Sequence, residues 1–520
     1  MADGLPKDPH LPKDSHLPES PHLAKSPHLA VIGAGPAGLA ATVAAAAHGV
    51  RVTLIDAAEQ AGGQFFRQPA AGLRAGRPQA LHHDWRTWER LRESLAAHVE
   101  AGAVRHLTDH HVWFVERRPG ERQSGRFTVH ALLGPEEEDP ATVDADAVLL
   151  ATGGYEKVLP FPGWTLPGVV TAGGAQAMLK GALVVPGRTA VVAGTGPLLL
   201  PVAAGLAAAG VEVAAFVESA APRVFLRRTR ALAAQPGKIA EGAGYAARLL
   251  RHRVRTLARH TVVEAHGGDR LEAVTVAALD GDGRVRPGTG RRIPCDTLAV
   301  GHGMLPHTDL AGTLGCGLDG LTVHVDDEQR TDVPGVWAAG EATGIGGSGL
   351  ALAEGHIAGR SAAARLGGGA PDPSEWAAAA KSRARLREFA AALDSVYTPA
   401  VHWTEQVLDD TMVCRCEEVT AGTIREAVAE LGAGDLRTVK LLTRAGMGWC
   451  QGRVCAPGVA GLTGCELTPS TRPFARPVSL GVLAREHPQP LDRVRTHPVK
   501  HEHTQPVQRE HTHPTDGGLS

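Results

Sequence analysis

Two stretches of the chain repeat one hydrophobic pattern. Leu29–Asp56 and Thr189–Glu218 each start with consecutive apolar residues, pass through a glycine turn into an alanine-rich segment, and end with a second apolar run and a carboxylate. Short uninterrupted apolar runs predict buried strands, and the alanine-rich segments predict helices. A strand, a glycine turn, a helix and a second strand form the unit that binds nucleotides in α/β proteins, so the repeat predicts two nucleotide-binding lobes.

Each unit is followed further along the chain by a short apolar run that ends in glycine. Ala147–Gly154 follows the first unit, and Thr297–Gly303 follows the second. Because a third segment of the same kind accompanies both units, the repeat indicates a true duplication and not a chance likeness of two glycine turns. We therefore expect an α/β fold with two Rossmann-like nucleotide-binding lobes.

The second unit contains a long stretch without charge. No charged residue occurs from Thr189 to Val211, which is long enough to cross a bilayer. Glycines and prolines early in this stretch favour a strand, a turn and a helix, so we expect no transmembrane segment. The N-terminus has charges and prolines where a secretory signal needs an apolar run, which predicts a cytoplasmic protein.

The two ends of the chain have a different composition from the rest. Residues 1–27 repeat an irregular unit rich in proline, histidine and charge, and the sequence from about Glu486 to Ser520 has the same character. Such segments cannot bury enough apolar surface to offset the entropy lost on ordering. We expect disordered termini.

The overall charge excludes some partners. The 520 residues hold 53 Lys and Arg against 55 Asp and Glu, a net charge of −2. Nothing in this balance attracts nucleic acid or an anionic membrane, so no nucleic-acid partner is expected. A chain of this length predicts several domains.

The first glycine turn predicts a dinucleotide site. Gly33 allows the tight turn after the strand, Gly35 lets a pyrophosphate approach the backbone, and Gly38 lets the helix pack closely on the strand. The N-terminus of the helix then offers free N–H groups to the phosphates. Asp56 stands where a carboxylate would bind a ribose hydroxyl and repel a 2′-phosphate.

Further segments point to FAD as that dinucleotide. Together with the first turn they resemble the flavoprotein disulfide-reductase superfold, in which a late segment returns to the first lobe and its acidic residue contacts the ribityl chain of the flavin. That residue is usually Asp, and Glu341 departs from the pattern. The segment Gly62–Pro69 lacks the cysteine pair of a thiol-disulfide relay, which disfavours a disulfide reductase. The residues that carry this resemblance are Gln64, Thr152, Gly153, Gly340 and Glu341.

The second glycine turn leaves its ligand open. It keeps Gly194 and Gly196, but Leu199 occupies the third glycine position, and this bulkier side chain makes close docking of a dinucleotide less certain. Glu218 would again favour an unphosphorylated ribose. NAD, another adenine nucleotide and an empty structural lobe all remain possible.

Four cysteines near the C-terminal end are spaced as a ligand set. Cys414 and Cys416 are followed after 33 residues by Cys450 and Cys455, and the sequence between predicts a helix capped at Thr420, a glycine turn and a second short helix. Two thiolates from one tight loop can then meet two from another. Such a set suits a [2Fe-2S] cluster or a structural zinc ion, and spacing alone leaves the choice open.

The cysteine segment resembles the [2Fe-2S] domain of bacterioferritin-associated ferredoxin, through its Cys-x-Cys pair and the sequence GWCQGRVC. The stretch from about His28 to Pro473 is similar to the FAD and iron-sulfur subunit shared by opine oxidases, hydrogen cyanide synthase and multi-subunit proline or hydroxyproline dehydrogenases. The resemblance implies a disulfide-reductase-like flavoprotein fold plus a small helical [2Fe-2S] domain, with FAD and a cluster on Cys414, Cys416, Cys450 and Cys455 as cofactors.

The expected boundaries follow from this resemblance and from the pattern. They are a tail at 1–27, the first part of the FAD-binding domain at 28–185, the second nucleotide-binding domain at 186–305, the second part of the FAD-binding domain at 306–366, a linker helix at 367–409, the [2Fe-2S] domain at 410–473, and a mostly disordered tail at 474–520.

The resemblance implies an electron relay. A flavin accepts two electrons together and a [2Fe-2S] cluster passes one at a time. In the similar complexes an amine-oxidase-like flavoprotein subunit dehydrogenates a secondary amine or amino acid, such as an opine, proline, hydroxyproline, sarcosine or glycine, and a subunit like this one relays electrons to an acceptor that the sequence does not identify. No catalytic acid, base or nucleophile is therefore assigned. The alternatives are a self-contained NADH-dependent reductase and a non-enzymatic redox sensor or iron-sulfur carrier.

Overall fold

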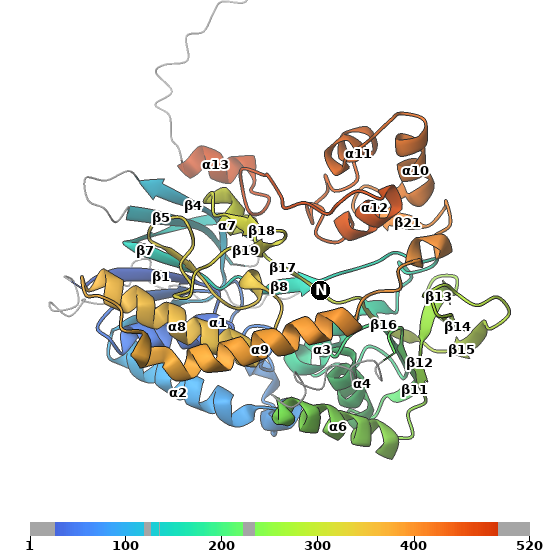
Figure 1. Ribbon diagram of the computed structural model, residues 1–520, viewed down its shortest axis with the longest axis horizontal. Helices are drawn as coiled ribbons and strands as arrows, with labels where there is room; N and C mark the ends of the chain where they lie inside the picture. Colours follow the sequence, from blue (N-terminus) through green and yellow to red (C-terminus); the bar gives the residue numbers. More distant parts are fainter. Residues whose placement is uncertain (1–25, 119–125, 135, 222–234, 487–520) are drawn as a thin grey trace, which may run out of the picture. The chain divides into compact units, whose positions relative to one another are not determined.

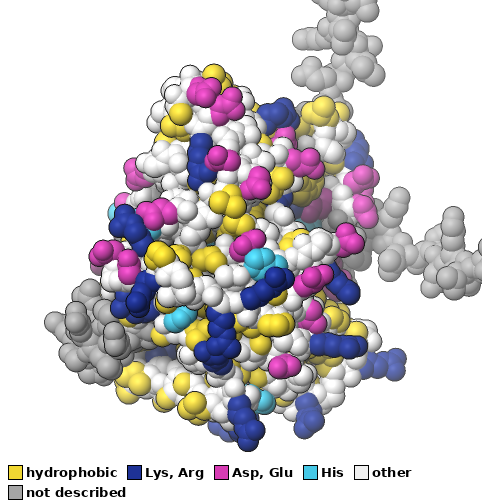
Figure 2. Space-filling view, turned by 90° about the vertical axis from the view of Figure 1, so that its right-hand side faces the viewer, with side chains coloured by type: hydrophobic (Ala, Val, Ile, Leu, Met, Phe, Trp, Pro, Cys, Tyr) yellow, Lys and Arg dark blue, Asp and Glu magenta, His cyan; other side chains and the backbone are white. Residues whose placement is uncertain are grey.

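The computed structural model describes residues 26–118, 126–134, 136–221 and 235–486. The expected disorder of residues 1–25 and 487–520 lies outside these ranges. Residues 474–478, which fall in the expected C-terminal tail, pack on the body: Ala475 is buried, and the rings of Phe474 and Trp113 meet edge to face at 4.9 Å. On the face shown in Figure 2, positive and negative side chains are interspersed.

The first lobe is built on a five-stranded parallel sheet with the order β20-β7-β1-β2-β3. Ile32 of β1 pairs with Ile55 of β2 and with Leu150 of β7, so the carboxyl ends of these strands meet at one edge. The strands are β1 (His28–Ile32), β2 (Arg51–Ile55), β3 (Val104–Leu107), β7 (Ala147–Leu150) and β20 (Val336–Ala338).

Helices cover one face of this sheet, and an antiparallel sheet covers the other (Figure 1). The helices are α1 (Pro36–Ala46), α2 (Trp85–Glu100) and α8 (Ser348–Leu366), and the antiparallel sheet consists of β4 (His110–Arg118), β5 (Arg126–Leu133) and β6 (Asp139–Ala145). Helices α1 and α8 approach closely because small residues face each other. A Cβ on Gly355 would lie 2.1 Å from the carbonyl oxygen of Ala37, and one on Gly359 would lie 2.3 Å from that of Ala41.

The second lobe repeats this architecture with the strand order β12-β11-β10-β16-β9. The uncharged stretch from Thr189 forms β10 (Thr189–Gly194), a glycine turn and α4 (Leu199–Ala208), as predicted, and no helix among the described residues could cross a membrane. The other elements are β9 (Val169–Thr171), β11 (Glu212–Glu218), β12 (Thr256–Ala258), β16 (Thr297–Gly301), α3 (Ala172–Ala177), α6 (Pro236–Arg251), and the antiparallel strands β13 (His260–His266), β14 (Ala273–Ala278) and β15 (Arg291–Pro294).

A long helix and several short elements complete the body. Helix α9 (Ala377–Val396) lies along α8 (Figure 1). The short elements include β8 (Gly154–Glu156), which pairs with β17 (Met304–Pro306), α7 (Asp309–Thr313), β18 (Leu318–Asp319), β19 (Thr322–Val323), the 3-10 turns η2 (Ala71–Leu73), η3 (Pro78–Leu81), η6 (Gly340–Thr343), η7 (Pro373–Trp376) and η8 (Trp403–Gln406), and the π-turn η4 (Met178–Ala182).

The cysteine segment forms a small module with its own core. Helix α10 begins where the sequence predicts, because the side chain of Thr420 accepts a hydrogen bond from the N–H of Thr423. The elements are β21 (Met412–Cys414), β22 (Val419–Thr420), α10 (Ala421–Ala429), α11 (Leu436–Thr443) and α12 (Ala456–Thr463), and α13 (Leu480–Glu486) follows. The core includes Val413, Ile424, Val439 and Val459. We did not predict α12, which begins directly after Cys455.

Candidate functional site

The first glycine turn has the geometry of a phosphate cradle. Gly33 follows β1 with a φ of +107°, and a Cβ there would lie 2.3 Å from the carbonyl oxygen of Ala151. A Cβ on Gly38 would lie 1.8 Å from the carbonyl oxygen of Gly33, so only glycine lets α1 pack this closely. Gly35 is open by comparison, since its nearest neighbour would be Gly63 Cα at 3.9 Å. The free N–H groups at the start of α1 therefore face a site that an anion can approach.

Asp56 closes one side of this turn. Its carboxylate accepts hydrogen bonds from the N–H of Ala34, inside the turn, and from that of Ala58 at 2.7 Å. The residue is only half-buried, so its oxygen atoms remain within reach of a ligand. This arrangement fits a carboxylate that binds a ribose hydroxyl beside the pyrophosphate.

The segment after β2 folds back over the glycine turn. The N–H of Gly62 donates to the carbonyl of Ala34 at 2.8 Å, and a Cβ on Gly63 would lie 2.7 Å from Gly35 Cα. Gln64 follows at the surface, and its side-chain oxygen accepts a hydrogen bond from Arg67 Nη2 at 2.7 Å. Gln64 therefore lies next to the turn, and its role in flavin binding stays a prediction.

Thr152 and Gly153 follow β7 at the same edge of the sheet. The hydroxyl of Thr152 donates to the carbonyl of His307 at 2.5 Å, and the N–H of His307 donates to the carbonyl of Gly153 at 2.9 Å. Gly153 has a φ of +74°, which glycine adopts without strain. These bonds fix the turn to the segment that precedes α7.

The return segment reaches the first lobe through Gly340 and Glu341, directly after β20. A Cβ on Gly340 would lie 2.8 Å from the Cβ of Ala37, so η6 sits against the start of α1. The carboxylate of Glu341 accepts hydrogen bonds from the N–H groups of Gly346, at 3.3 Å, and Gly347, at 2.9 Å, and burial raises its pKa. The longer side chain is thus held by its own loop, and a direct contact with a ribityl chain stays a prediction.

Sequence reasoning missed the residue that holds this return segment. Glu354, in the middle of α8, is fully buried and accepts hydrogen bonds from the N–H of Gly340 at 3.0 Å and from the hydroxyl of Thr343 at 2.9 Å. Arg387 of α9 completes the set, with its Nη2 at 2.5 Å from Glu354. Burial raises the pKa of Glu354, and Arg387 opposes that shift. The available signal was a lone carboxylate in a stretch of mostly small and apolar residues, 348–364.

The second glycine turn is also tightly built. Gly194 has a φ of +130°, and a Cβ there would lie 1.8 Å from the carbonyl oxygen of Gly301, whereas Gly196 is open. Leu199 does not push the helix away from the sheet, because neighbouring β16 ends in Gly301. A Cβ on that glycine would lie 3.2 Å from Leu199 Cδ2. The strand next to the helix thus supplies the small residue that the third turn position lacks.

Glu218 differs from Asp56 in its exposure. Its carboxylate accepts hydrogen bonds from the N–H of Gly196 at 3.2 Å and from that of Ala220 at 2.9 Å, but the residue is only 3% exposed. Burial raises the pKa of Glu218 to about 7, against the effect of these hydrogen bonds. A ligand can therefore reach a smaller part of the Glu218 carboxylate than of the Asp56 carboxylate.

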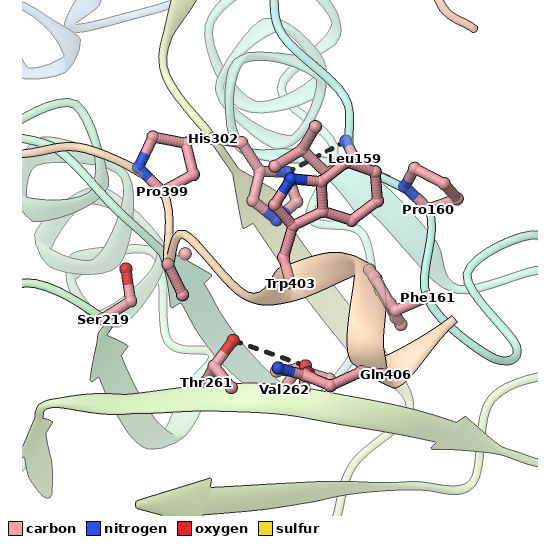
Figure 3. Close-up of a pocket in the computed structure, with 12 residues that line it drawn as sticks. Leu159, Pro160, Phe161, Ser219, Thr261, Val262, His302, Pro399, Trp403 and Gln406 are labelled. Atoms are coloured by element: carbon pink, nitrogen blue, oxygen red, sulfur yellow. Dashed lines mark hydrogen bonds between the residues drawn. The ribbon is translucent and has the colours of Figure 1, made fainter. Parts of the chain in front are cut away.

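A segment after α9 covers the carboxyl edge of the second sheet. A cavity of about 30 Å³ lies between the lobe and this segment, and Figure 3 shows Trp403 and His302 among the residues that line it. That volume suits one or two water molecules and is far too small for a nucleotide. Burial lowers the pKa of His302 to about 4, and its Nδ1 accepts a hydrogen bond from the N–H of Leu159 at 3.3 Å. The lobe contributes Gly194, Ser219 and His302 to the lining, and the segment contributes Pro399, Ala400, Trp403 and Gln406.

The four predicted thiols come together. Cys450 interacts with Cys416 and with Cys455, and Cys455 interacts in turn with Cys414. Cys414 and Cys455 are buried, whereas Cys416 is exposed. The turn before Cys450 requires glycine, because a Cβ on Gly448 would lie 2.2 Å from the Cβ of Cys416. Interaction among these thiols lowers the pKa of Cys450 and raises that of Cys455, so the side chains are close enough to share a proton.

Four thiols brought together from two loops fit a metal centre. A [2Fe-2S] cluster shares four thiolates between two irons, and tetrahedral zinc takes four ligands around one ion, so the thiols alone suit either. Burial raises the pKa values of Cys295 and Cys316 to about 12 and about 11, which disfavours reactive thiolates at these two positions.

Contacts between the cysteine module and the first lobe bring the two predicted cofactor sites together. Arg453, which lies between Cys450 and Cys455, donates to Asp309 Oδ2 from its Nε at 3.1 Å and from its Nη2 at 2.5 Å. Asp309 is two residues from His307, which binds Gly153. Burial alone would raise the pKa of Asp309, but His307 and Arg453 hold it at about 2, so the carboxylate is ionised. A chain of direct contacts thus runs from the glycine turn after β7 to the loop of Cys450.

Comparison with protein families matches most of the chain. Residues 27–367 match the family described as pyridine nucleotide-disulphide oxidoreductase, and residues 412–462 match the BFD-like [2Fe-2S] binding domain. These matches agree with the FAD-binding body and the cluster module that the sequence predicts.

Individual proteins match over nearly the same span. The hydrogen cyanide synthase subunit HcnB of Pseudomonas protegens is 34% identical over 82% of this chain and 89% of its own length. One subunit of the opine oxidase from Agrobacterium tumefaciens is 33% identical over 82% of this chain and 84% of its own length. Among solved structures, the L-proline dehydrogenase from P. horikoshii shares the fold, with a TM-score of 0.59 at 20% identity over 89% of this chain and 81% of that one.

Proposed function

Because the chain belongs to the pyridine nucleotide-disulphide oxidoreductase family and adds a BFD-like [2Fe-2S] binding domain to the FAD-binding body, we propose that it is the electron-relay subunit of an amine dehydrogenase or oxidase. Its substrate is a secondary amine or amino acid of the opine, proline, hydroxyproline, sarcosine or glycine type. A bound flavin takes up an electron pair, and a bound [2Fe-2S] cluster passes electrons singly.

The observation that carries the relay is the contact between the two sites. Tyr155 lies three residues after Thr152, its ring meets that of His307 edge to face, and it lies within electrostatic range of Cys450. Three residues span at most about 11 Å. The polypeptide therefore holds the turn expected at the flavin and a cluster ligand close together, which supports direct electron transfer between them.

The role as one chain of a larger enzyme is supported by the relatives. HcnB, the alpha subunit of sarcosine oxidase and their counterpart in opine oxidase are all named as subunits. The segment Gly62–Pro69 lacks cysteine, so this chain does not offer the redox cysteine pair used against disulfides. We propose that an amine-oxidase-like flavoprotein subunit binds the amine and that this chain receives its electrons.

The decisive experiment compares the chain alone with the chain co-expressed with such a partner. Opines, proline, hydroxyproline, sarcosine and glycine are assayed with an artificial electron acceptor. We expect turnover of one substrate class only when both chains are present, because a relay works faster when donor and acceptor are held in one complex. Rapid turnover of any of these amines by the isolated chain contradicts the proposal.

The NADH-dependent alternative is weaker on structural grounds. The segment that carries Trp403 covers the carboxyl edge of the second sheet, where α/β folds bind their ligands, and Glu218 is almost fully buried. We expect NADH added without oxygen to leave the flavin absorption of the isolated chain unchanged. Fast bleaching would favour the self-contained reductase.

A further inference from the structure

Arg472 lies on the segment that leads from the cysteine module back to the first lobe. Its Nη2 donates a hydrogen bond to the carbonyl of Gln451, the residue that follows Cys450. The same guanidinium group lies within electrostatic range of Cys450, Arg453 and Asp309. Arg472 is therefore attached to the loop that carries two of the four thiols, although the sequence between them spans another helix.

One nitrogen of this side chain has no acceptor. Arg472 Nη1 is buried and finds no hydrogen-bond partner among the residues that the structure describes. A buried N–H without an acceptor costs stability, and an arginine stays charged even where burial lowers its pKa, as it does here. The described polypeptide thus presents one unused, charged donor next to Cys450.

The neighbouring arginine does not share this property. Arg453 gives two hydrogen bonds to Asp309, and their charges offset each other. In the described part of the chain, no carboxylate lies within ion-pair distance of Arg472. Of the two arginines beside the cysteine loop, Arg472 is therefore the one without a directly paired carboxylate, although Asp309 lies within electrostatic range.

Sulfur ligands of an iron-sulfur cluster accept such hydrogen bonds. The reduction potential of a cluster rises when N–H groups bond to its sulfur atoms and when positive charge lies nearby, because both stabilise the more negative reduced state. The hydrogen bond to Gln451, the residue after Cys450, holds the guanidinium group within electrostatic range of Cys450.

We propose that Arg472 Nη1 donates a hydrogen bond to a cluster sulfur at Cys450, and that Arg472 thereby raises the reduction potential of the cluster. Arg472 is a tuning residue and not a ligand. The inference requires the cluster on the four cysteines but not the amine-oxidising partner, so it can fail while the proposed function stands.

The test is a redox titration followed by electron paramagnetic resonance on the full chain, purified without oxygen. We expect the cluster in Arg472→Gln to have a more negative midpoint potential than the wild type. Arg472→Lys should lie between them, because lysine keeps the charge but loses the planar pair of donors. Arg437→Gln is the matched control, since it removes one positive charge from an exposed position on α11 of the same module. A wild-type potential in Arg472→Gln overturns the proposal.

A second measurement needs no substitution of Arg472. Wild-type chain labelled with ¹⁵N only in the guanidinium groups of arginine is reduced, and the magnetic coupling between the cluster and ¹⁵N is recorded. We expect a coupling in the wild type that persists in Arg453→Lys. If the wild type shows none, the hydrogen bond does not exist, even where Arg472→Gln fails to retain its cluster.

Discussion

Glycine is the residue whose role the sequence predicts best. Gly33 and Gly38 are required because a Cβ at either position would collide with backbone atoms only a few residues away or on the adjacent strand. Such demands are encoded in the local motif. The carboxylates Asp56 and Glu218 hold equivalent positions in the two lobes, yet one is half-buried and the other almost fully buried. Local sequence cannot reveal this difference, because exposure depends on what remote segments cover.

The glycine requirement at Gly38 can be measured through flavin content. In Gly38→Ala the new methyl group would meet the carbonyl of Gly33, which must move out of the phosphate cradle. Backbone shifts of this kind cost about 1 to 3 kcal/mol, or roughly 5-fold to 150-fold in affinity. We expect FAD binding to weaken by that factor in a titration of the apoprotein. Gly72→Ala is the control, since nothing lies within 4 Å of its Cβ, and equal affinity of both variants would contradict the assignment.

Burial of Glu218 predicts a pH-dependent stability. Its pKa is about 7 in the folded chain against an ordinary 4.5, so the folded state holds an extra proton between these values. Stability therefore falls as the pH rises from 4.5 through 7, by roughly 3 kcal/mol at most. Burial raises the pKa of Tyr397, and the charge of nearby Glu218 raises it further. Glu218→Gln removes the carboxylate. The melting temperature of the variant relative to the wild type should therefore rise as the pH is raised from about 5 to about 8. If the difference in melting temperature between Glu218→Gln and the wild type is the same at pH 5 and at pH 8, the buried carboxylate is not the cause of the pH dependence.

At the scale of elements, the hydrophobic pattern predicts the strand, turn and helix of each lobe, and the capping residue Thr420 predicts the start of a helix. They could not give the partners of these elements. The linker helix expected within residues 367–409 exists as α9. The same helix holds η6 through Arg387 and Glu354, and this contact joins residues 33 positions apart in the sequence. Likewise, nothing local indicates that Trp403 would cover the second sheet.

The pair formed by Arg387 and Glu354 should hold the return segment in place. Arg387→Gln leaves a fully buried carboxylate without its cation, a change that costs roughly 3 kcal/mol or more in other proteins. Because η6 rests on Glu354, we expect a lower melting temperature together with faster release of FAD. Arg385→Gln, at an exposed position on the same helix, is the control and should behave like the wild type. Lower stability with an unchanged rate of FAD release would show that η6 does not contact the flavin.

At the scale of the whole molecule, the sequence predicts which modules are present but not how they meet. Each cofactor module has a compact local motif, whereas the ion pair of Arg453 and Asp309 joins residues 144 positions apart. Two charged residues in separate parts of the chain carry no pattern that would pair them. The proximity of the two cofactor sites therefore emerges only from the folded chain.

Separate cores predict that the cluster can be lost without the flavin. The cysteine module has its own hydrophobic core, distinct from those beside the first sheet. Cys450→Ser should abolish the iron-sulfur absorption and loosen this module, because cluster binding and folding are coupled, while about one FAD per chain remains. Cys465→Ser is the control and should keep both cofactors. Parallel loss of FAD in Cys450→Ser would show that the modules are not independent. Stoichiometric zinc without acid-labile sulfide in the wild type would contradict the relay itself.

The unequal exposure of the thiols makes one corner of the cluster vulnerable. Cys416 is open to solvent, whereas Cys414 and Cys455 are enclosed by the module. Dissolved oxygen and peroxide therefore reach the cluster from the Cys416 side, and damage begins there. Protein handled in air is expected to contain fewer than two irons per flavin, and that deficit will measure the history of the sample and not the composition of the enzyme in the cell.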